Sequence, residues 1–221
     1  MKSKIMPFAF DDGLIEQAKT SATPVVDIYP FRFPAVVAGR GSIIEDEIYV
    51  DNVHTDRIPI YRRKGGGCSV FLDPGNVIVS IAFPAKGFGG IQALFNLSSD
   101  WMIQKFERSG LTGIYQDGIS DIVKENRKIG GSCFYRAKGI AYYSAAILVT
   151  PDLGAMDRYL AHPPREPVYR GNRSHKAFVS GLDRWFPELT AKKLSQDLSG
   201  GLEPSVLSVE MMSTLNSAVL K

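Results

Sequence analysis

A cluster of basic residues directly precedes three consecutive glycines near the centre of the chain. These residues are Arg62, Arg63, Lys64, Gly65, Gly66 and Gly67. Glycine within a strand-forming region is unfavourable unless the backbone needs a positive φ or another group must approach it closely. The pattern therefore predicts backbone N–H groups that face a phosphate, with cations beside them. The alternative is a flexible hairpin turn with a solvated basic edge.

A second group of residues that could do chemistry lies about 60 positions further on. It consists of Asp121, Lys128, the pair Gly130 and Gly131, and Ser132. A lysine beside bare backbone contacts a phosphoryl or carboxyl oxygen as a point charge. A carboxylate on a neighbouring strand can hold a magnesium ion that bridges phosphates. Two glycine-bearing strands with cations and an acid between them predict a site for an acyl-adenylate.

The elements around these motifs predict an α+β fold, with a mixed, largely antiparallel sheet and helices packed against it. Runs rich in Val, Ile, Tyr and Phe alternate with turn residues, and their connections are mostly too short for helical crossovers. The predicted strands span residues 24–30, 34–39, 58–63, 68–72, 77–83, 118–123, 127–135 and 140–150. The predicted helices span residues 10–19, from a cap at Ser98 or Ser99 to Gly110, from Ser174 to Trp185, and a tail after Pro204.

The composition limits the classes of protein that fit. The chain has 221 residues and a formal net charge of +3, which is too small a charge to indicate a nucleic-acid partner. It contains no apolar stretch long enough for a membrane span and no signal-peptide hydrophobic region. Two cysteines are too few for a disulfide framework, so we expect a cytoplasmic protein. We expect one catalytic domain over residues 1–221, with residues 161–221 forming a basic loop and C-terminal helices, and no large accessory C-terminal domain.

Both motifs resemble the signatures of lipoate–protein ligases. "GRGSIIEDEIYVDNVHTDRIPIYRRKGGGCSVFLDPGN" is similar to the first signature, with its Gly-Arg, Arg-Arg, glycine triplet, short strand and Asp-x-Gly-Asn. "KIGGSC", residues 128–133, matches the second signature, Lys-x-x-Gly-Ser-Ala. An Asn-Asp pair precedes that lysine in the family, and Ser120-Asp121 stands in its place. The similarity extends over residues 25–160.

The resemblance implies a biotin/lipoate ligase-like catalytic domain that activates lipoate or octanoate with ATP. The acyl-adenylate then passes its acyl group to a lysine of a lipoyl acceptor protein. On this template Lys128 is the catalytic residue, because it contacts the carboxylate and the α-phosphate. The resemblance also implies Mg²⁺, with Asp121 as its support. The implied lipoate- and ATP-binding residues are Arg40, Arg62, Arg63, Gly65, Gly66, Gly67, Asn76, Asp121, Gly131 and Ser132.

The chain departs from the family pattern at three places. Leu72 replaces the histidine of a His-Asp step, and Ser144 begins the segment that is His-Gly-Thr in the family. The third departure is that about 60 residues follow Leu160, too few for the further domain of the larger bacterial ligases. A separate accessory chain, an ATP-independent octanoyl or lipoyl transferase that uses a cysteine or lysine, and a weakened lipoate-binding module all remain alternatives.

The cysteines and a basic loop each have two interpretations. Cys68 and Cys133 follow the glycine clusters, either as thioester nucleophiles or as small buried side chains. Residues 162–176 either meet an acidic acceptor domain or the phosphates of the ligand, or form a solvated loop. The basic side chains of that loop are Arg165, Arg170, Arg173 and Lys176.

Overall fold

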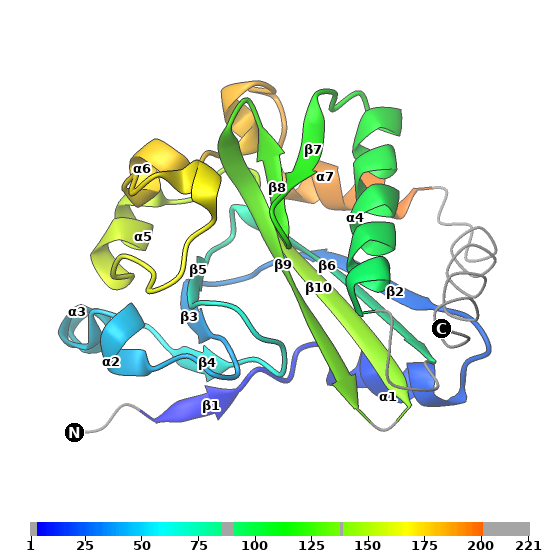
Figure 1. Ribbon diagram of the computed structural model, residues 1–221, viewed down its shortest axis with the longest axis horizontal. Coiled ribbons are helices and arrows are strands. Elements are labelled where there is room, and N and C mark those ends of the chain that lie inside the picture. Colours follow the sequence, from blue (N-terminus) through cyan, green and yellow to red (C-terminus); the bar gives the residue numbers. More distant parts are fainter. Residues whose placement is uncertain (1–3, 85–90, 138, 201–221) are drawn as a thin grey trace.

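Two β-sheets with helices packed against them form the framework of the protein (Figure 1). The structure, a computed structural model, describes residues 4–84, 91–137 and 139–200. The helix predicted after Pro204 lies outside these residues. Among the described helices, none combines the length and the apolar character that crossing a membrane requires.

The larger sheet contains six strands, and all five pairings are antiparallel. Its order is β2 (Val25–Pro30), β6 (Asn76–Pro84), β10 (Ile140–Leu148), β9 (Arg127–Ala137), β8 (Asp121–Lys124) and β7 (Ile114–Asp117). Side chains alternate between the two faces along each strand. On β6, Val77, Val79 and Ile81 enter the main core, whereas Ile78 and Ala82 enter two smaller ones. Burial of both faces explains why this strand is an almost continuous apolar run.

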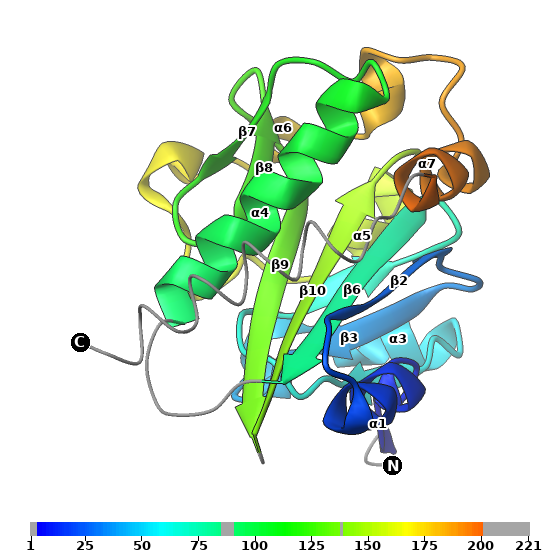
Figure 2. The ribbon, with the colours of Figure 1, turned by 90° about the vertical axis from the view of Figure 1, so that its right-hand side faces the viewer.

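Helices α4 (Ile91–Arg108) and α7 (Ala191–Ser199) lie on one face of the larger sheet (Figure 2). The predicted start of α4 at Ser98 or Ser99 is wrong, because both serines are buried inside the helix. The helix begins earlier because its apolar positions recur at helical spacing upstream of the serines. The predicted end at Gly110 is confirmed, since this glycine has a φ of 79°.

The smaller sheet combines parallel and antiparallel pairs. Its order is β1 (Ile5–Pro7), β4 (Ile60–Arg62), β3 (Ala35–Ala38) and β5 (Val70–Leu72). Strand β4 runs parallel to both neighbours, and the crossover from β3 to β4 contains the short helices α2 (Ile44–Glu47) and α3 (Val50–Thr55). The α+β class with mixed, largely antiparallel pairing is therefore confirmed, but the strands divide between two sheets.

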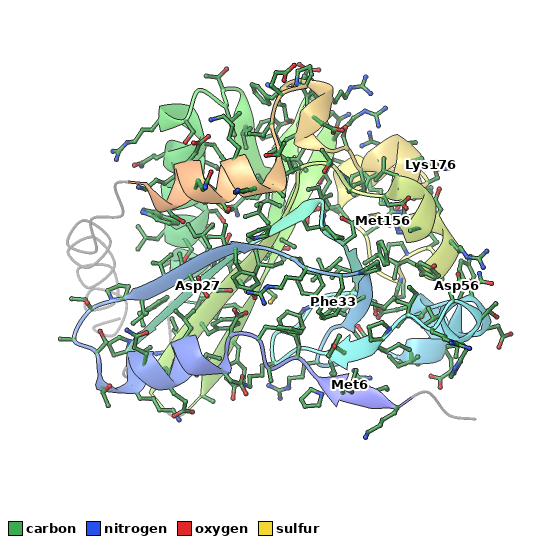
Figure 3. All side chains as sticks on the ribbon, turned by 180° about the vertical axis from the view of Figure 1, so that it is seen from behind. Met6, Asp27, Phe33, Asp56, Met156 and Lys176 are labelled. Carbon is green, nitrogen blue, oxygen red and sulfur yellow. The ribbon has the colours of Figure 1, made fainter. Side chains whose placement is uncertain are left out.

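The second face of the larger sheet carries helix α1 (Asp12–Thr20) and part of the smaller sheet. Leu14 and Ala18 of α1 pack against Ala82 and Tyr142. Further along, Ile78 packs against apolar residues of the smaller sheet, and Figure 3 shows Phe33 in this region between the two sheets. This second face holds the motif residues described below.

The segment after β10 folds back across the end of β9. It contains α5 (Leu153–Tyr159), η1 (Val168–Arg170), α6 (His175–Phe178) and η2 (Leu182–Arg184). Ser174 caps α6 as predicted, because its Oγ accepts a hydrogen bond from the backbone N of Ala177. The predicted continuation to Trp185 is wrong: Val179 forms a β-bridge with Lys128, and the Ser180 N–H donates to the Lys128 carbonyl. A tertiary contact thus interrupts the helical pattern.

The hairpin of β7 and β8 also differs from the prediction. The predicted strand over residues 118–123 begins at Asp121, because Gly118 has a φ of 61° and residues 118–120 form the turn between β7 and β8. Strand β7 itself was not predicted, and neither were β1 and the helices α2, α3, α5 and α7.

Candidate active site

The glycine segment rests directly on strand β9. A Cβ atom added to Gly65 would lie 2.6 Å from the Sγ atom and 2.9 Å from the Cβ atom of Cys133. Real Cβ atoms do not approach heavy atoms so closely, so a larger residue at position 65 would force the glycine segment or Cys133 to shift. The two sequence motifs, separated by more than 60 residues, therefore meet at this contact.

The Arg63 guanidinium holds the glycine segment in shape. Its Nη2 donates to the carbonyls of Gly66 at 2.7 Å and Cys68 at 2.8 Å, and its Nε donates to Gly66 at 3.1 Å. Its Nη1 donates to the Val37 carbonyl at 3.0 Å. These bonds use most of the five N–H donors of the guanidinium. Arg63 thus supports the segment on which a ligand would rest, and direct ligand contact stays a prediction.

Arg62 plays a similar part for the neighbouring turn. Its Nη1 donates to the Gly39 carbonyl at 2.8 Å. A Cβ atom on Gly39 would lie only 1.9 Å from the Gly67 carbonyl oxygen, so this turn packs closely against the glycine segment. The backbone N–H of Arg40 donates to the Gly65 carbonyl at 2.9 Å. The Arg40 side chain itself is exposed and makes no polar contact within the described part of the chain, so it is available to a ligand.

Lys128 forms an ion pair with Asp121 at the start of β9. The Lys128 Nζ lies 2.6 Å from Asp121 Oδ1, and the Tyr169 hydroxyl donates to Asp121 Oδ2 at 3.0 Å. The Asp121 side chain is 9% exposed and that of Lys128 is 28% exposed. Burial, together with the negative charge of Asp121, raises the pKa of Tyr169, so the phenol stays protonated and donates.

Gly131 and Cys133 bring the ion pair and the glycine segment onto one face of β9. A Cβ atom on Gly131 would lie 3.0 Å from both Cε and Nζ of Lys128, so the lysine side chain lies across this glycine. Residues two apart on a strand share a face and are separated by roughly 7 Å. The Lys128 ammonium and the Gly65 backbone are therefore neighbours along the same strand face.

Gly66 differs from the glycines beside it. It is exposed, and a Cβ atom added to it would meet no heavy atom of the described residues within 4 Å. Its φ lies outside the left-handed region, so the protein's own packing and backbone conformation do not require glycine here. A glycine that neither packing nor backbone conformation requires leaves room for a ligand to approach the backbone closely.

Ser132 and Asn76 make contacts within the protein. The Ser132 N–H and hydroxyl both donate to the Ser120 carbonyl, at 2.9 and 3.1 Å, and so fix the turn before β8. The Oδ1 of Asn76 accepts from the Asp73 N–H at 2.8 Å, whereas its buried Nδ2 has no hydrogen-bond partner among the residues that the structure describes. Contact of either residue with a ligand stays a prediction.

Both oxygens of Asp121 already have partners in this structure, so a magnesium ion there would compete with them, and Asp121 as magnesium support stays a prediction. One of its oxygens is engaged by Lys128 and the other by Tyr169. Across residues 4–84, 91–137 and 139–200, no group of three His, Cys, Asp or Glu side chains could hold a metal ion. A cation beside the Lys128 ammonium would also be repelled.

The structure disfavours Cys133 as a nucleophile. Burial raises the pKa of the Cys133 thiol, although the Arg63 guanidinium acts in the opposite direction. A thiol with a raised pKa carries little of the reactive thiolate. Cys68 is also a free cysteine, and its Sγ contacts the Arg165 carbonyl at 3.7 Å.

The basic loop over residues 162–176 is anchored by hydrogen bonds of its arginines, although about half of its residues are exposed. The Arg173 guanidinium donates to the carbonyls of Tyr169 at 2.6 Å and Arg170 at 2.8 Å, and to Asn126 at 3.0 Å. Arg170 is only 4% exposed and stacks on the Phe178 ring at 4.9 Å. These contacts fix the loop so that the Tyr169 hydroxyl lies next to Asp121. The arginines stand out in the sequence, but no pattern there indicated Tyr169 as a site residue.

A buried polar network occupies the position of the missing His-Gly-Thr element. The Ser80 hydroxyl donates to that of Ser144 at 3.2 Å, and Ser80 also lies 3.4 Å from the Tyr142 hydroxyl. The hydroxyls of Tyr142 and Tyr29 donate to the two oxygens of Asp11. Burial raises the pKa of the Asp11 carboxyl despite these hydrogen bonds. Ser144 is paired with Cys133 across the strands, so the network lies next to the glycine segment.

Two surface cavities of about 350 and 410 Å³ lie away from the ion pair. The first is lined by residues that include Phe71, Asp73, Asp152 and Tyr159, and the second by residues of α2 and α3. The contact of Gly65 with Cys133 closes the space between the glycine segment and β9.

Comparison with known proteins gives consistent results. A family model described as "Lipoyl protein ligase A/B catalytic domain" matches residues 4–203. The lipoate–protein ligase of Streptococcus pyogenes serotype M5 (strain Manfredo) is 25% identical over 150 residues, 67% of this chain and 43% of that protein. The chain spans about half the length of the curated relatives it matches first, from 43% to 60%.

Two solved structures share the fold. One is described as a bi-partite lipoate protein ligase and its E2 lipoyl domain from Thermoplasma acidophilum, with a TM-score of 0.73, 18% identity, and coverage of 98% of this chain and 91% of that one. The other is a lipoate–protein ligase A bound with ATP, with a TM-score of 0.71, 19% identity, and coverage of 98% and 94%.

Proposed function

Because the chain belongs to the lipoyl protein ligase A/B catalytic domain family, we propose that it is a lipoate–protein ligase. In this proposal it activates lipoate or octanoate with ATP and transfers the acyl group to a lysine of a lipoyl acceptor domain. One observation carries the proposal: Lys128 and Gly65 rest on Gly131 and Cys133, two neighbouring positions on one face of β9. A cation and a bare backbone thus adjoin the same patch of sheet.

The first half-reaction needs positive charge where negative charge develops. The carboxylate oxygen of the acid attacks the α-phosphorus of ATP, an O–P bond forms, and pyrophosphate leaves. Lys128 supplies the cation, and the backbone N–H groups beside Gly66 supply donors to the phosphoryl oxygens. The ion pair with Asp121 keeps the Lys128 ammonium positioned before the substrate arrives.

The second half-reaction moves the acyl group to the acceptor. A neutral lysine amine of the acceptor attacks the carbonyl carbon of the acyl-adenylate, the amide C–N bond forms, and AMP leaves with its phosphate oxygen. The amine proton is released to solvent. No covalent intermediate with the protein is needed, which agrees with the raised pKa of Cys133.

Other parts of the expected function belong to the same proposal. They are the organisation of residues 1–221 as one catalytic domain, a cytoplasmic location where ATP is available, and a second accessory chain. The structurally similar bi-partite ligase supports the accessory chain. Because Asp121 is engaged by Lys128 and Tyr169, magnesium belongs to the proposal only as a companion of the nucleotide phosphates.

ATP–pyrophosphate exchange tests the proposal. The purified protein is incubated with ATP, Mg²⁺ and radiolabelled pyrophosphate, with lipoate, octanoate, biotin or no acid. Exchange that depends on lipoate or octanoate is the expected result, and it would also show that adenylation needs no second chain. Lack of exchange with every acid, combined with acyl transfer from a loaded carrier domain, would instead support the ATP-independent transferase.

A further inference from the structure

Two exposed aliphatic side chains, Ile119 and Val168, lie on adjacent loops beside the ion pair. We propose that they form the docking surface for the acceptor domain, and that this domain is acidic around its target lysine. The inference rests on the proposed function and adds to it the site at which the protein substrate binds.

The exposure of both side chains is unusual for their type. Ile119 is 68% exposed and Val168 is fully exposed. A Cβ atom on Gly118 would lie 3.8 Å from the Cβ of Pro167, so the residues that precede Ile119 and Val168 lie close together. Single exposed aliphatic residues are common on protein surfaces, but adjacent ones that project from two loops indicate an interaction site.

Both loops are held in place by hydrogen bonds. The Gln116 Nε2 donates to the Ile119 carbonyl at 3.1 Å, and Gly118 adopts the left-handed turn conformation. On the other loop, the Arg170 N–H donates to the Pro167 carbonyl at 2.9 Å. The two aliphatic side chains are thus presented on ordered backbone, which lowers the entropic cost of binding a partner.

The surface borders the place where the acyl group would be transferred. Ile119 lies two residues before Asp121, which is at most roughly 7 Å of extended backbone. Val168 directly precedes Tyr169, whose hydroxyl donates to Asp121. Asp121 in turn holds Lys128, so a domain that contacts both aliphatic residues has its own lysine within reach of the ion pair.

The charge of the adjoining loop selects an acidic partner. Residues 162–176 contain four Arg or Lys side chains and a single carboxylate, Glu166. That carboxylate is already engaged by Arg170 and by His162. Arg165 is exposed, and so is Lys176 on the outer side of α6, although its ammonium lies 3.8 Å from a carboxylate oxygen of Asp157 (Figure 3). Aliphatic contact beside excess positive charge fits a domain whose apolar patch is surrounded by carboxylates.

Two assays on the full chain separate docking from adenylation. Trapping of the acyl-adenylate by hydroxylamine yields a hydroxamate and needs no acceptor domain. Acyl transfer to an unmodified E2 lipoyl domain, measured over a range of its concentration, reports on docking. The variants are Ile119→Asp, Val168→Asp and the double substitution. Ile5→Asp is the matched control, since Ile5 is a 39% exposed side chain on β1 of the other sheet.

The double variant should form hydroxamate at the wild-type rate, while its KM for the lipoyl domain should rise roughly tenfold. The control should change neither quantity. Raised salt should increase the wild-type KM, because the basic loop contributes attraction. An unchanged KM in the double variant overturns the docking inference alone. If the double variant loses a self-association that the wild type shows in solution, while its KM is unchanged, the docking inference is also overturned. The surface would then belong to the contact between two copies of the chain. Absence of hydroxamate from the wild type, combined with acyl transfer from a loaded carrier domain, refutes the proposed function, and the docking inference with it.

Discussion

Alanine substitution at Gly65 and at Gly66 should have opposite consequences, because one glycine is needed by the protein and the other by a ligand. At position 65 the new Cβ would lie 2.6 Å from Sγ and 2.9 Å from Cβ of Cys133. At position 66 it would meet no atom within 4 Å in the part of the chain that the structure describes. The two substitutions add the same methyl group to adjacent residues of one segment, so each serves as a control for the other.

The expected effect of Gly65→Ala is a loss of stability. Overpacking of this kind costs about 1–3 kcal/mol, which in a chain of this size lowers Tm by roughly 2–4 °C per kcal/mol. Cys133→Gly removes both conflicting atoms, so in that background Gly65→Ala should cost no more than about 0.5 kcal/mol. The Phe134 carbonyl oxygen, at 3.3 Å from the new Cβ, would be the remaining close neighbour.

Gly66→Ala should leave Tm unchanged or raise it slightly, since alanine restricts the unfolded chain by about 0.4–1 kcal/mol relative to glycine. Its lipoate-dependent ATP–pyrophosphate exchange should nevertheless fall at least roughly tenfold, because the methyl group separates the ligand from backbone N–H donors. Calorimetry or thermal melting gives the stabilities, and exchange assays give the activities.

Two results would refute this reasoning. If Gly65→Ala were equally destabilising in the wild-type chain and in the Cys133→Gly background, the glycine segment would not rest on β9 as described. If Gly66→Ala retained wild-type exchange, the open surroundings of Gly66 would have no connection with a ligand.

Three further substitutions test individual residues. Lys128→Gln should reduce pyrophosphate exchange by roughly 10²–10³-fold. The added substitution Asp121→Asn should restore thermal stability but not exchange. Recovery of exchange in this double variant would exclude Lys128 from the reaction. Cys133→Ala should retain at least half of the wild-type exchange and acyl transfer, because the raised pKa of the Cys133 thiol disfavours the reactive thiolate. Loss of acyl transfer without loss of exchange would instead support the thioester mechanism. Asp11→Asn tests the buried network through pH. Since the folded-state pKa of Asp11 is raised, its contribution to stability is present below the unfolded pKa and is lost as pH rises through the folded value. The Tm of the variant relative to the wild type should therefore increase from pH 4 to pH 7, and a difference that stays constant with pH would contradict the assignment.

The local elements that hold the site were largely predictable. The strands that became β2, β3, β6, β9 and β10 follow from apolar and β-branched runs bounded by turn residues, because strand formation depends on patterns within a few neighbouring positions. The end of α4 at Gly110 and the cap of α6 at Ser174 have the same local origin. The two glycine motifs could also be recognised from residue type and spacing.

Contacts between distant segments decided the rest. The sequence shows three adjacent glycines, but only the packing on Cys133 distinguishes Gly65 from the unobstructed Gly66. The sequence motif predicts that Arg63 offers its positive charge to a ligand. In the structure, its guanidinium donates instead to the backbone carbonyls of Val37, Gly66 and Cys68. The early end of α6 has a similar cause, because Val179 bridges to Lys128.

By itself, the sequence determined the secondary structure around the motifs, the α+β class and the residue types available for adenylate chemistry. The tertiary structure decided which of those residues meet. The clearest case is Tyr169, which lies 48 positions from Asp121 and donates to it through a loop held by arginine–carbonyl bonds. Side-chain hydrogen bonds of this kind depend on distances across the fold, which no pattern within one segment encodes.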